Sequence, residues 1–242
     1  MAKVIKKPQE IFAEITADFQ QACGADLLSI MLYGSGAGNY YLPGQSDLNF
    51  LIILKEVGIV NLEQCLTVIG KWGKRRVAVV FMTPAYIADS QDAFPVELLN
   101  MQLNHLVVYG EDGLADLKLA AGELRLQLER ELKGKVLHLQ QGFLACGGKA
   151  KGLRQLIGVS MGSFLPLFTV LLFLRGYKIP PGRRDLIKAL SLAYPVKADV
   201  FLQAIDIREK RSKLSDRELK ELFKSYHHEI ACLAKRIDKL EV

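Results

Sequence analysis

The sequence predicts an α+β fold in which a mixed sheet with flanking helices is followed by an all-α helical bundle. Short apolar runs of strand length alternate with helical patterns in the first half of the chain. Beyond Asp116 the strand signals end, and stretches with helical spacing continue to the C-terminus. We therefore expect a sheet domain over residues 1–114 and a helical bundle domain over residues 115–242. The predicted strands are Leu27–Tyr33, Leu48–Leu54, Val77–Met82 and His105–Tyr109.

Helices of the first domain follow from apolar spacing and from turn residues. Pro8 can stand in the first turn of a helix whose apolar positions recur as far as Ala22. Asn61 is expected to cap a helix over Leu62–Gly70. Thr83 precedes a proline and predicts the start of another helix. Short helices are expected at Ala85–Asp89 and Pro95–Leu103.

The second half reads as a succession of helices separated by glycine, proline and polar residues. The last of them opens at Ser215 with Glu218 three residues later, which is the pattern of a capping box. The expected helices cover about residues 117–146, 151–175, 184–193, 196–208 and 215–240.

One apolar segment in this half has two interpretations. Gln155–Leu174 contains twenty residues without a charge, which is long enough for a helix to cross a bilayer. The run also carries polar residues and Pro166, and the central helix of a bundle has the same composition. We expect a core helix and no membrane association, with a membrane anchor as the alternative.

Composition places the chain among folded globular proteins, because 50% of its 242 residues are hydrophobic and 24% are charged. The net charge of +6 favours a partner that carries phosphate. The excess is modest, so we expect a nucleotide rather than nucleic acid. The cysteines Cys23, Cys65, Cys146 and Cys232 show no Cys-x-x-Cys spacing, which predicts reduced thiols in a cytoplasmic protein.

A glycine-rich loop joins the first two predicted strands and is the main candidate site. Four glycines lie between Tyr33 and Leu48, a pattern that lets the backbone approach an anion. Asp47 and Asn49 lie two residues apart at the start of the second strand, so their side chains leave on the same face. Oxygen ligands on one face, opposite a Gly-Ser turn, are what a magnesium-nucleotide site requires.

This stretch resembles the nucleotidyltransferase superfamily, which includes the aminoglycoside adenylyltransferases and DNA polymerase beta. The motif of that superfamily is a Gly-Ser turn, a short spacer, and then Ser-Asp-hydrophobic-Asp-hydrophobic. Gly34-Ser35 matches the turn, and Ser46-Asp47-Leu48 matches the start of the second half. The resemblance covers about residues 10–114, and a helical C-terminal domain is the usual companion in the antibiotic-modifying branch.

The resemblance implies roles for five residues. Gly34, Ser35 and Ser46 would hold phosphate oxygens of a nucleoside triphosphate. Asp47 and Asn49 would be the catalytic residues and the ligands of Mg²⁺, the expected cofactor.

The chain departs from the family pattern at two acids. The family has aspartate where this chain has Asn49, whose amide brings an oxygen but no charge. A third acid is expected on the strand Val77–Met82, which contains no carboxylate. Glu111-Asp112 could replace a missing ligand, although a solvated turn is the simpler interpretation. The basic run Lys74-Arg75-Arg76 could take phosphate or could be a solvated connection.

Two functions therefore remain open. In the first, the protein binds a magnesium-nucleoside triphosphate and transfers a nucleotidyl group to a hydroxyl acceptor on a small molecule or protein. In the second, it is a catalytically inactive pseudoenzyme of the same fold that acts as a nucleotide sensor or as a partner in a complex. The acceptor, the preferred base and the formation of a homo-oligomer cannot be deduced from the sequence.

Overall fold

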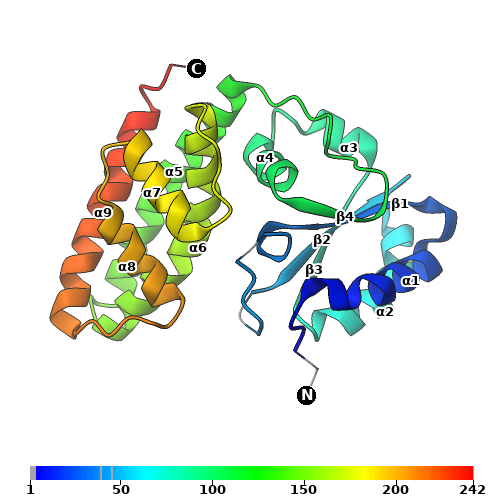
Figure 1. Cartoon of the computed structure of the whole chain (residues 1–242), viewed down its shortest axis with the longest axis horizontal. Coiled ribbons are helices and arrows are strands. Elements are labelled where there is room, and N and C mark those ends of the chain that lie inside the picture. Colours follow the sequence, from blue (N-terminus) through cyan, green and yellow to red (C-terminus); the bar gives the residue numbers. More distant parts are fainter. Residues whose placement is uncertain (1–3, 39, 45, 242) are drawn as a thin grey trace. The chain divides into compact units, whose positions relative to one another are not determined.

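The computed structural model describes residues 4–38, 40–44 and 46–241. The chain divides into two compact units, which Figure 1 shows with their elements labelled. The sheet unit comprises the chain up to Phe94 together with Leu98–Lys118. The helical unit comprises Pro95–Glu97 and the chain from Leu119 onward.

The sheet unit is organised around a mixed four-stranded sheet with the strand order β3-β2-β1-β4. The central strand β1 pairs antiparallel with both β2 and β4, whereas β3 joins β2 in parallel. Three strands begin and end where the sequence predicts, and β4 extends one residue further. The strands are β1 (Leu27–Tyr33), β2 (Leu48–Leu54), β3 (Val77–Met82) and β4 (His105–Gly110).

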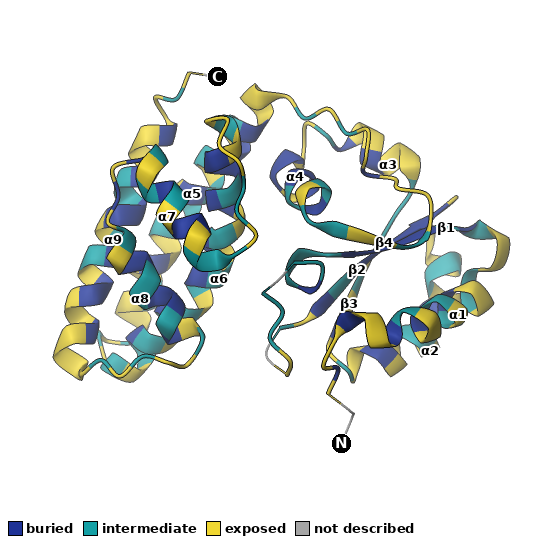
Figure 2. Ribbon diagram, in the orientation of Figure 1, coloured by how far each residue is buried: buried dark blue, intermediate teal, exposed yellow. Residues whose placement is uncertain are grey.

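Two helices cover one face of this sheet. A short 3-10 turn, η1 (Pro8–Ile11), leads into α1 (Phe12–Cys23), which packs beside α2 (Ile59–Gly73) (Figure 1). Their apolar side chains meet the alternate residues of β1 and β2, strands that are almost wholly buried in Figure 2. The buried core on this face includes Ile11, Ile15, Phe19, Ile30, Leu32, Phe50, Ile52 and Trp72.

The opposite face of the sheet is only partly covered. After α3 (Pro84–Asp89), α4 (Pro95–Leu103) and β4, the chain folds back so that Gly113 lies against Met31 and Ile53. Further along the same face, Ala78 and Val80 of β3 remain exposed. The uncovered part of this face therefore lies beside the start of β2, where the candidate site was predicted.

The N-terminal cap of α2 differs from the prediction. The capping residue is Gly58, and Asn61 stands at the third helical position, where its side-chain oxygen accepts a hydrogen bond from the Gly58 N–H at 3.1 Å. The helix therefore begins at Ile59, before Asn61 rather than after it.

The first long helix of the second half begins later than predicted, at Ala121 rather than at Leu117. The backbone just before it is engaged elsewhere, because the Gln102 side chain donates to the Leu117 carbonyl at 3.1 Å. Similarly, the Lys118 N–H donates to the Gln91 side chain at 3.0 Å. These bonds hold the connection against the sheet unit.

The helical unit is built around the aromatic side chains of three helices. Phe168 packs edge-on against Phe201 with ring centroids 5.1 Å apart, and Phe164 meets Tyr226 in the same manner at 5.9 Å. At the start of the last helix, the predicted capping box is present, because the Ser215 hydroxyl accepts from the Glu218 N–H. The helices are α5 (Ala121–Ala145), α6 (Ala150–Leu174), α7 (Arg183–Ala193), α8 (Ala198–Arg208) and α9 (Asp216–Ile237).

The apolar helix α6 lies within the helical unit, where it packs against α5, α7, α8 and α9. It is long and apolar enough to cross a membrane by length and composition alone, a test that core helices also pass. Its buried side chains include Ile157, Met161, Phe164 and Phe168. These neighbours favour the core-helix interpretation over a membrane anchor.

Phe168→Ala is expected to lower the free energy of unfolding of the helical unit by about 3–5 kcal/mol, because it leaves a cavity among buried aromatic rings. Urea unfolding followed by circular dichroism would measure this loss. Fluorescence of the single tryptophan, Trp72, reports the sheet unit separately. Phe173→Ala, at a side chain that is 39% exposed, is the matched control and should cost about 0.5 kcal/mol or less. Equal losses in the two variants would contradict this account of the core.

Candidate functional site

The glycine loop begins with a left-handed residue that is hydrogen-bonded to Asn104, the residue before β4. Gly34 has φ +70° and opens the short 3-10 turn η3 (Gly34–Gly36) directly after β1. Its N–H donates to the Asn104 carbonyl at 3.0 Å, and its own carbonyl accepts from Asn104 Nδ2 at 2.9 Å. The same amide nitrogen donates to the Tyr40 hydroxyl at 2.6 Å. Asn104 therefore connects both Gly34 and Tyr40 of the loop to the start of β4.

The turn packs closely on the ends of the strands. A Cβ on Gly36 would lie 2.8 Å from a Leu48 methyl and 2.9 Å from a Leu32 methyl, so a larger residue would push the turn away from the sheet. Ser35, which is half-buried, stands between the two glycines. Within the described part of the chain its hydroxyl has no hydrogen-bond partner. This hydroxyl is therefore available to a ligand at the turn.

The far end of the loop is closed by Ser46. Its N–H donates to the Leu42 carbonyl at 2.8 Å, and its hydroxyl accepts from the Leu42 N–H at 3.2 Å. Ser46 thus holds the loop in a tight turn before β2. A direct contact between Ser46 and phosphate stays a prediction.

The register of the sheet brings Asn49 to the turn. Asn49 pairs with Tyr33 of β1 on one side and with Ala78 of β3 on the other. A Cβ added to Gly34 would lie 3.5 Å from Asn49 Nδ2, which places the amide directly beside the first loop residue. Ala78 therefore stands beside Asn49 on β3, the strand on which the family pattern places a third acid.

Asp47 lies beside an arginine rather than beside another acid. Arg76, the residue before β3, places its Nη2 atom 2.8 Å from Asp47 Oδ1. The Leu48 N–H donates to the Arg76 carbonyl at 3.0 Å, which fixes this neighbourhood through the backbone. The Asp47 and Arg76 side chains are 57% and 51% exposed, so both can reach a ligand from solvent. Arg76 itself has φ +62°, a left-handed conformation that favours glycine.

The donor atoms at this place are fewer than the family pattern provides for a magnesium ion. In nucleotide sites Mg²⁺ is held by one or two carboxylates together with substrate phosphates and waters, and here one carboxylate and one neutral amide are available. The carboxylate of Asp47 already faces a guanidinium cation. Among the described residues, no group of three or more Asp, Glu, His or Cys side chains could hold a metal. Mg²⁺ as the cofactor stays a prediction, and the site offers it one carboxylate that is shared with Arg76.

Asp112, which the sequence suggested as a replacement ligand, is engaged in its own turn. Its carboxylate accepts from the Leu114 N–H at 3.0 Å and lies 3.0 Å from His105 Nε2. Partial burial raises the pKa of Asp112, but the Leu114 N–H and His105 outweigh this effect and hold the pKa below its usual value. The solvated-turn interpretation of this residue is therefore the better one.

Tyr33 is the last residue of β1, which lies between β2 and β4. It pairs with Asn49 on one side and with His105 on the other, and burial raises the pKa of its hydroxyl. A tyrosine that stays protonated at neutral pH is a hydrogen-bond donor rather than a base. Tyr33 consequently provides no substitute for the missing carboxylates.

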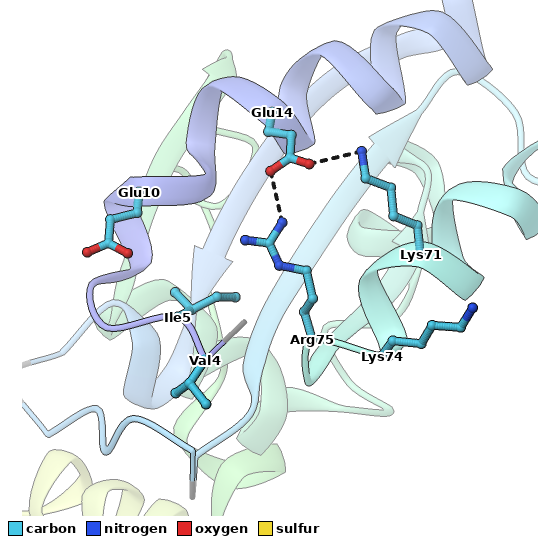
Figure 3. A pocket seen from close by; sticks show the side chains of 7 residues that line it. All are labelled: Val4, Ile5, Glu10, Glu14, Lys71, Lys74 and Arg75. Atoms are coloured by element: carbon cyan, nitrogen blue, oxygen red, sulfur yellow. Dashed lines mark hydrogen bonds and ion pairs between the residues drawn. The ribbon is translucent and has the colours of Figure 1, made fainter. Parts of the chain in front are cut away.

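Arg75 of the basic run and the nearby Lys71 form ion pairs on the helix-covered face. Figure 3 shows Glu14 between Arg75 and Lys71, with N···O distances of 2.8 Å and 3.0 Å, while Lys74 extends away from Glu14. Arg75 also stacks on Trp72, with the guanidinium carbon 4.6 Å from the ring centroid. The hollow of about 670 Å³ beside these residues is lined by charges of both signs, of which Glu14, Lys71 and Arg75 pair with one another. It is not a strong candidate for a phosphate.

No protein-family model matches the sequence, and no curated protein matches it either. Among solved structures, the chain is similar to the spectinomycin adenyltransferase AAD(9) from Enterococcus faecialis, solved with ATP and spectinomycin. That similarity has a TM-score of 0.61 and 13% identity, and it covers 95% of this chain and 99% of the other. A nucleotidyltransferase-like protein from Exiguobacterium sibiricum 255-15 matches with a TM-score of 0.36 and 12% identity, over 96% of this chain and 74% of the other.

The likeness to the adenyltransferase confirms the fold expected from the sequence. The chain has a nucleotidyltransferase fold, with a mixed sheet, flanking helices and a helical C-terminal region. Within it, the Asn49 amide lies beside Gly34. The roles of Gly34, Asp47 and Asn49 in nucleotide binding stay predictions.

Sequence reasoning missed two residues of the site. Asn104 follows Gly34 by seventy positions, and nothing in its local sequence indicates that it clamps the loop. Arg76 was noticed only as part of a basic run. The parallel pairing of β2 with β3, which the order of the strands alone does not reveal, is what places it at Asp47.

Proposed function

We propose that this protein binds a nucleoside triphosphate at the Gly34-Ser35 turn and does not transfer its nucleotidyl group. The observation that carries the proposal is the pairing of β2 with β3. It sets Asp47 against Arg76 and Asn49 against Ala78, where a transferase needs carboxylates. The protein is then a nucleotide sensor or a nucleotide-dependent partner in a complex.

Nucleotide binding is supported by the loop and by the fold. A left-handed glycine, a close-packed turn and an available Ser35 hydroxyl form a surface suited to phosphate oxygens. The adenyltransferase with which the chain shares its fold was solved with ATP. The net charge of +6 also favours a phosphate-bearing ligand.

The lack of transfer follows from the charges at the reacting end. Nucleotidyl transfer depends on cations that clamp the attacking and leaving oxygens, and on a group that accepts the proton of the acceptor hydroxyl. Asp47 is the single carboxylate on the described site edge, and its negative charge is offset by Arg76. An acceptor hydroxyl would thus have no metal ion to hold the attacking and leaving oxygens and no base to accept its proton.

Calorimetric titration with ATP, GTP, CTP and UTP tests the proposal. At least one nucleotide should bind, and Ser35→Ala should weaken it by roughly tenfold because a hydrogen bond to a charged phosphate is lost. Ser191→Ala removes a hydroxyl of the helical unit that bonds to the Lys188 carbonyl, and it should leave the affinity unchanged.

Two results would contradict the proposal. Absence of binding by all four nucleotides would remove the nucleotide role altogether. Pyrophosphate release with a panel of hydroxyl acceptors would show that transfer survives, and the protein would then be an enzyme of the type that the sequence motif suggests.

A further inference from the structure

We propose that the Arg76 guanidinium takes the place of the divalent cation, so that the nucleoside triphosphate binds to this protein without metal. This inference rests on the proposed function, because it concerns the same turn and the same ligand. It identifies the ligand as the metal-free nucleotide, and it assigns the charge that meets the phosphates to the side chain of the residue before β3.

The sheet geometry puts Arg76 within reach of a ligand at the turn. β2 lies between β1 and β3, so the turn after β1 and the residue before β3 are separated by one strand. Adjacent strands lie about 4.8 Å apart, which places the two sides of the site at about 10 Å. A triphosphate held at Ser35 can therefore extend across Asn49 towards Arg76.

The chemistry of the guanidinium suits this role. Arginine presents several N–H donors in a planar fork and pairs with phosphate oxygens in a bidentate manner. One of its nitrogens, Nη2, contacts Asp47 at 2.8 Å, and the side chain is half-exposed. Asp47 thus acts as a positioning residue that orients the fork.

The same pair argues against a metal ion beside it. A divalent cation that approached Asp47 would meet the positive charge of Arg76 at the only carboxylate of this described edge. If a metal ion displaced Arg76 from Asp47, one acid and one amide would be its protein ligands, which is a weak cation site. The guanidinium and the metal ion are therefore alternatives at Asp47.

The backbone gives independent evidence that the side chain matters. Arg76 has φ +62°, and its N–H and carbonyl are held by Gly73 and Leu48 in the connection from α2 to β3. Glycine would occupy this conformation without the strain that a Cβ brings. The connection itself does not require arginine, so the requirement lies in what the guanidinium contacts.

The experiment compares ATP binding in EDTA with binding in excess Mg²⁺, for the natural chain and three variants. The natural chain should bind at least as well in EDTA. Arg76→Gly, which removes the cation and relieves the backbone strain, should lose roughly tenfold or more in both conditions. Lys74→Gln removes an equal charge two residues away and should bind as the natural chain does.

Asp47→Asn separates the two models by the sign of its effect. It keeps an oxygen to orient Arg76 and removes a negative charge near the phosphates, so affinity should rise. A metal ligand would behave in the opposite way, and a loss of roughly tenfold or more would overturn the inference. Arg76→Gly should retain the melting temperature of the natural chain within a few degrees, because relief of strain offsets the lost ion pair.

The outcomes distinguish this inference from the proposed function. Binding that occurs with Mg²⁺ and disappears in EDTA would overturn the role of Arg76 and leave the nucleotide function intact. Binding that is unaffected in Arg76→Gly would have the same meaning. Failure of every nucleotide to bind in both conditions would overturn both.

Discussion

The variant that combines Asn49→Asp, Ala78→Asp and Arg76→Gln is expected to bind Mg²⁺ more tightly than the natural protein by on the order of tenfold or more. The register pairs residue 49 with residue 78, and Asp47 lies on the same face two positions before. Three carboxylates would then converge on the edge where the guanidinium now sits. Ala78 is exposed, so the new side chain needs no space in the core.

Titration with Mg²⁺ alone, by calorimetry, measures this gain directly. Crowded carboxylates repel one another without metal, so the melting temperature of the variant should fall in EDTA and recover in Mg²⁺. A matched variant with Asn49→Gln, Ala78→Ser and Arg76→Gln adds polar groups without charge and should show neither effect. If the acidic variant gained no Mg²⁺ affinity, the register would not place these positions as the structure does.

Gly34→Val is expected to reduce nucleotide affinity by on the order of tenfold or more, the second large effect. Gly34 has φ +70°, and its Cβ position lies 3.5 Å from Asn49 Nδ2. A β-branched residue in that conformation costs about 1–2 kcal/mol, so the turn should move to relieve it. The paired hydrogen bonds with Asn104 would then weaken, and Ser35 would leave its position.

Gly24→Val is the control for backbone strain. Gly24 has φ +54°, follows α1 in open space and lies outside the glycine loop. Both variants should lose a similar amount of stability in urea unfolding, but Gly24→Val should retain its nucleotide affinity. Equal losses of affinity would mean that the Gly34 effect is a general destabilisation of the sheet unit.

Much of the fold could be predicted because its signals are local. The strands Leu27–Tyr33, Leu48–Leu54 and Val77–Met82 are apolar runs between turn residues, and each has the predicted ends in the structure. Errors arose where a side chain several positions away decides the boundary. Asn61 bonds back to Gly58, and Gln102 holds the backbone at Leu117, so the neighbouring helices begin elsewhere than apolar spacing suggests.

The candidate site was predictable only along one strand. Asp47 and Asn49 share a face because of the period of a strand, which the sequence shows directly. Their neighbours across the sheet depend on strand order and register, which are set by packing over the whole unit. Sequence reasoning could therefore report that acids are absent from β3, but it could not show that Arg76 and Ala78 are what stand in their places.

The Asp47–Arg76 pair has a consequence for how the protein would respond inside a cell. A bound ion exchanges with its surroundings, so a site that uses one reports the supply of that ion as well as the supply of its ligand. A cation that is covalently part of the chain is always present at the same stoichiometry. Occupancy of this site would then follow the concentration of uncomplexed nucleotide, and rising magnesium would lower occupancy by sequestering the ligand rather than by acting on the protein.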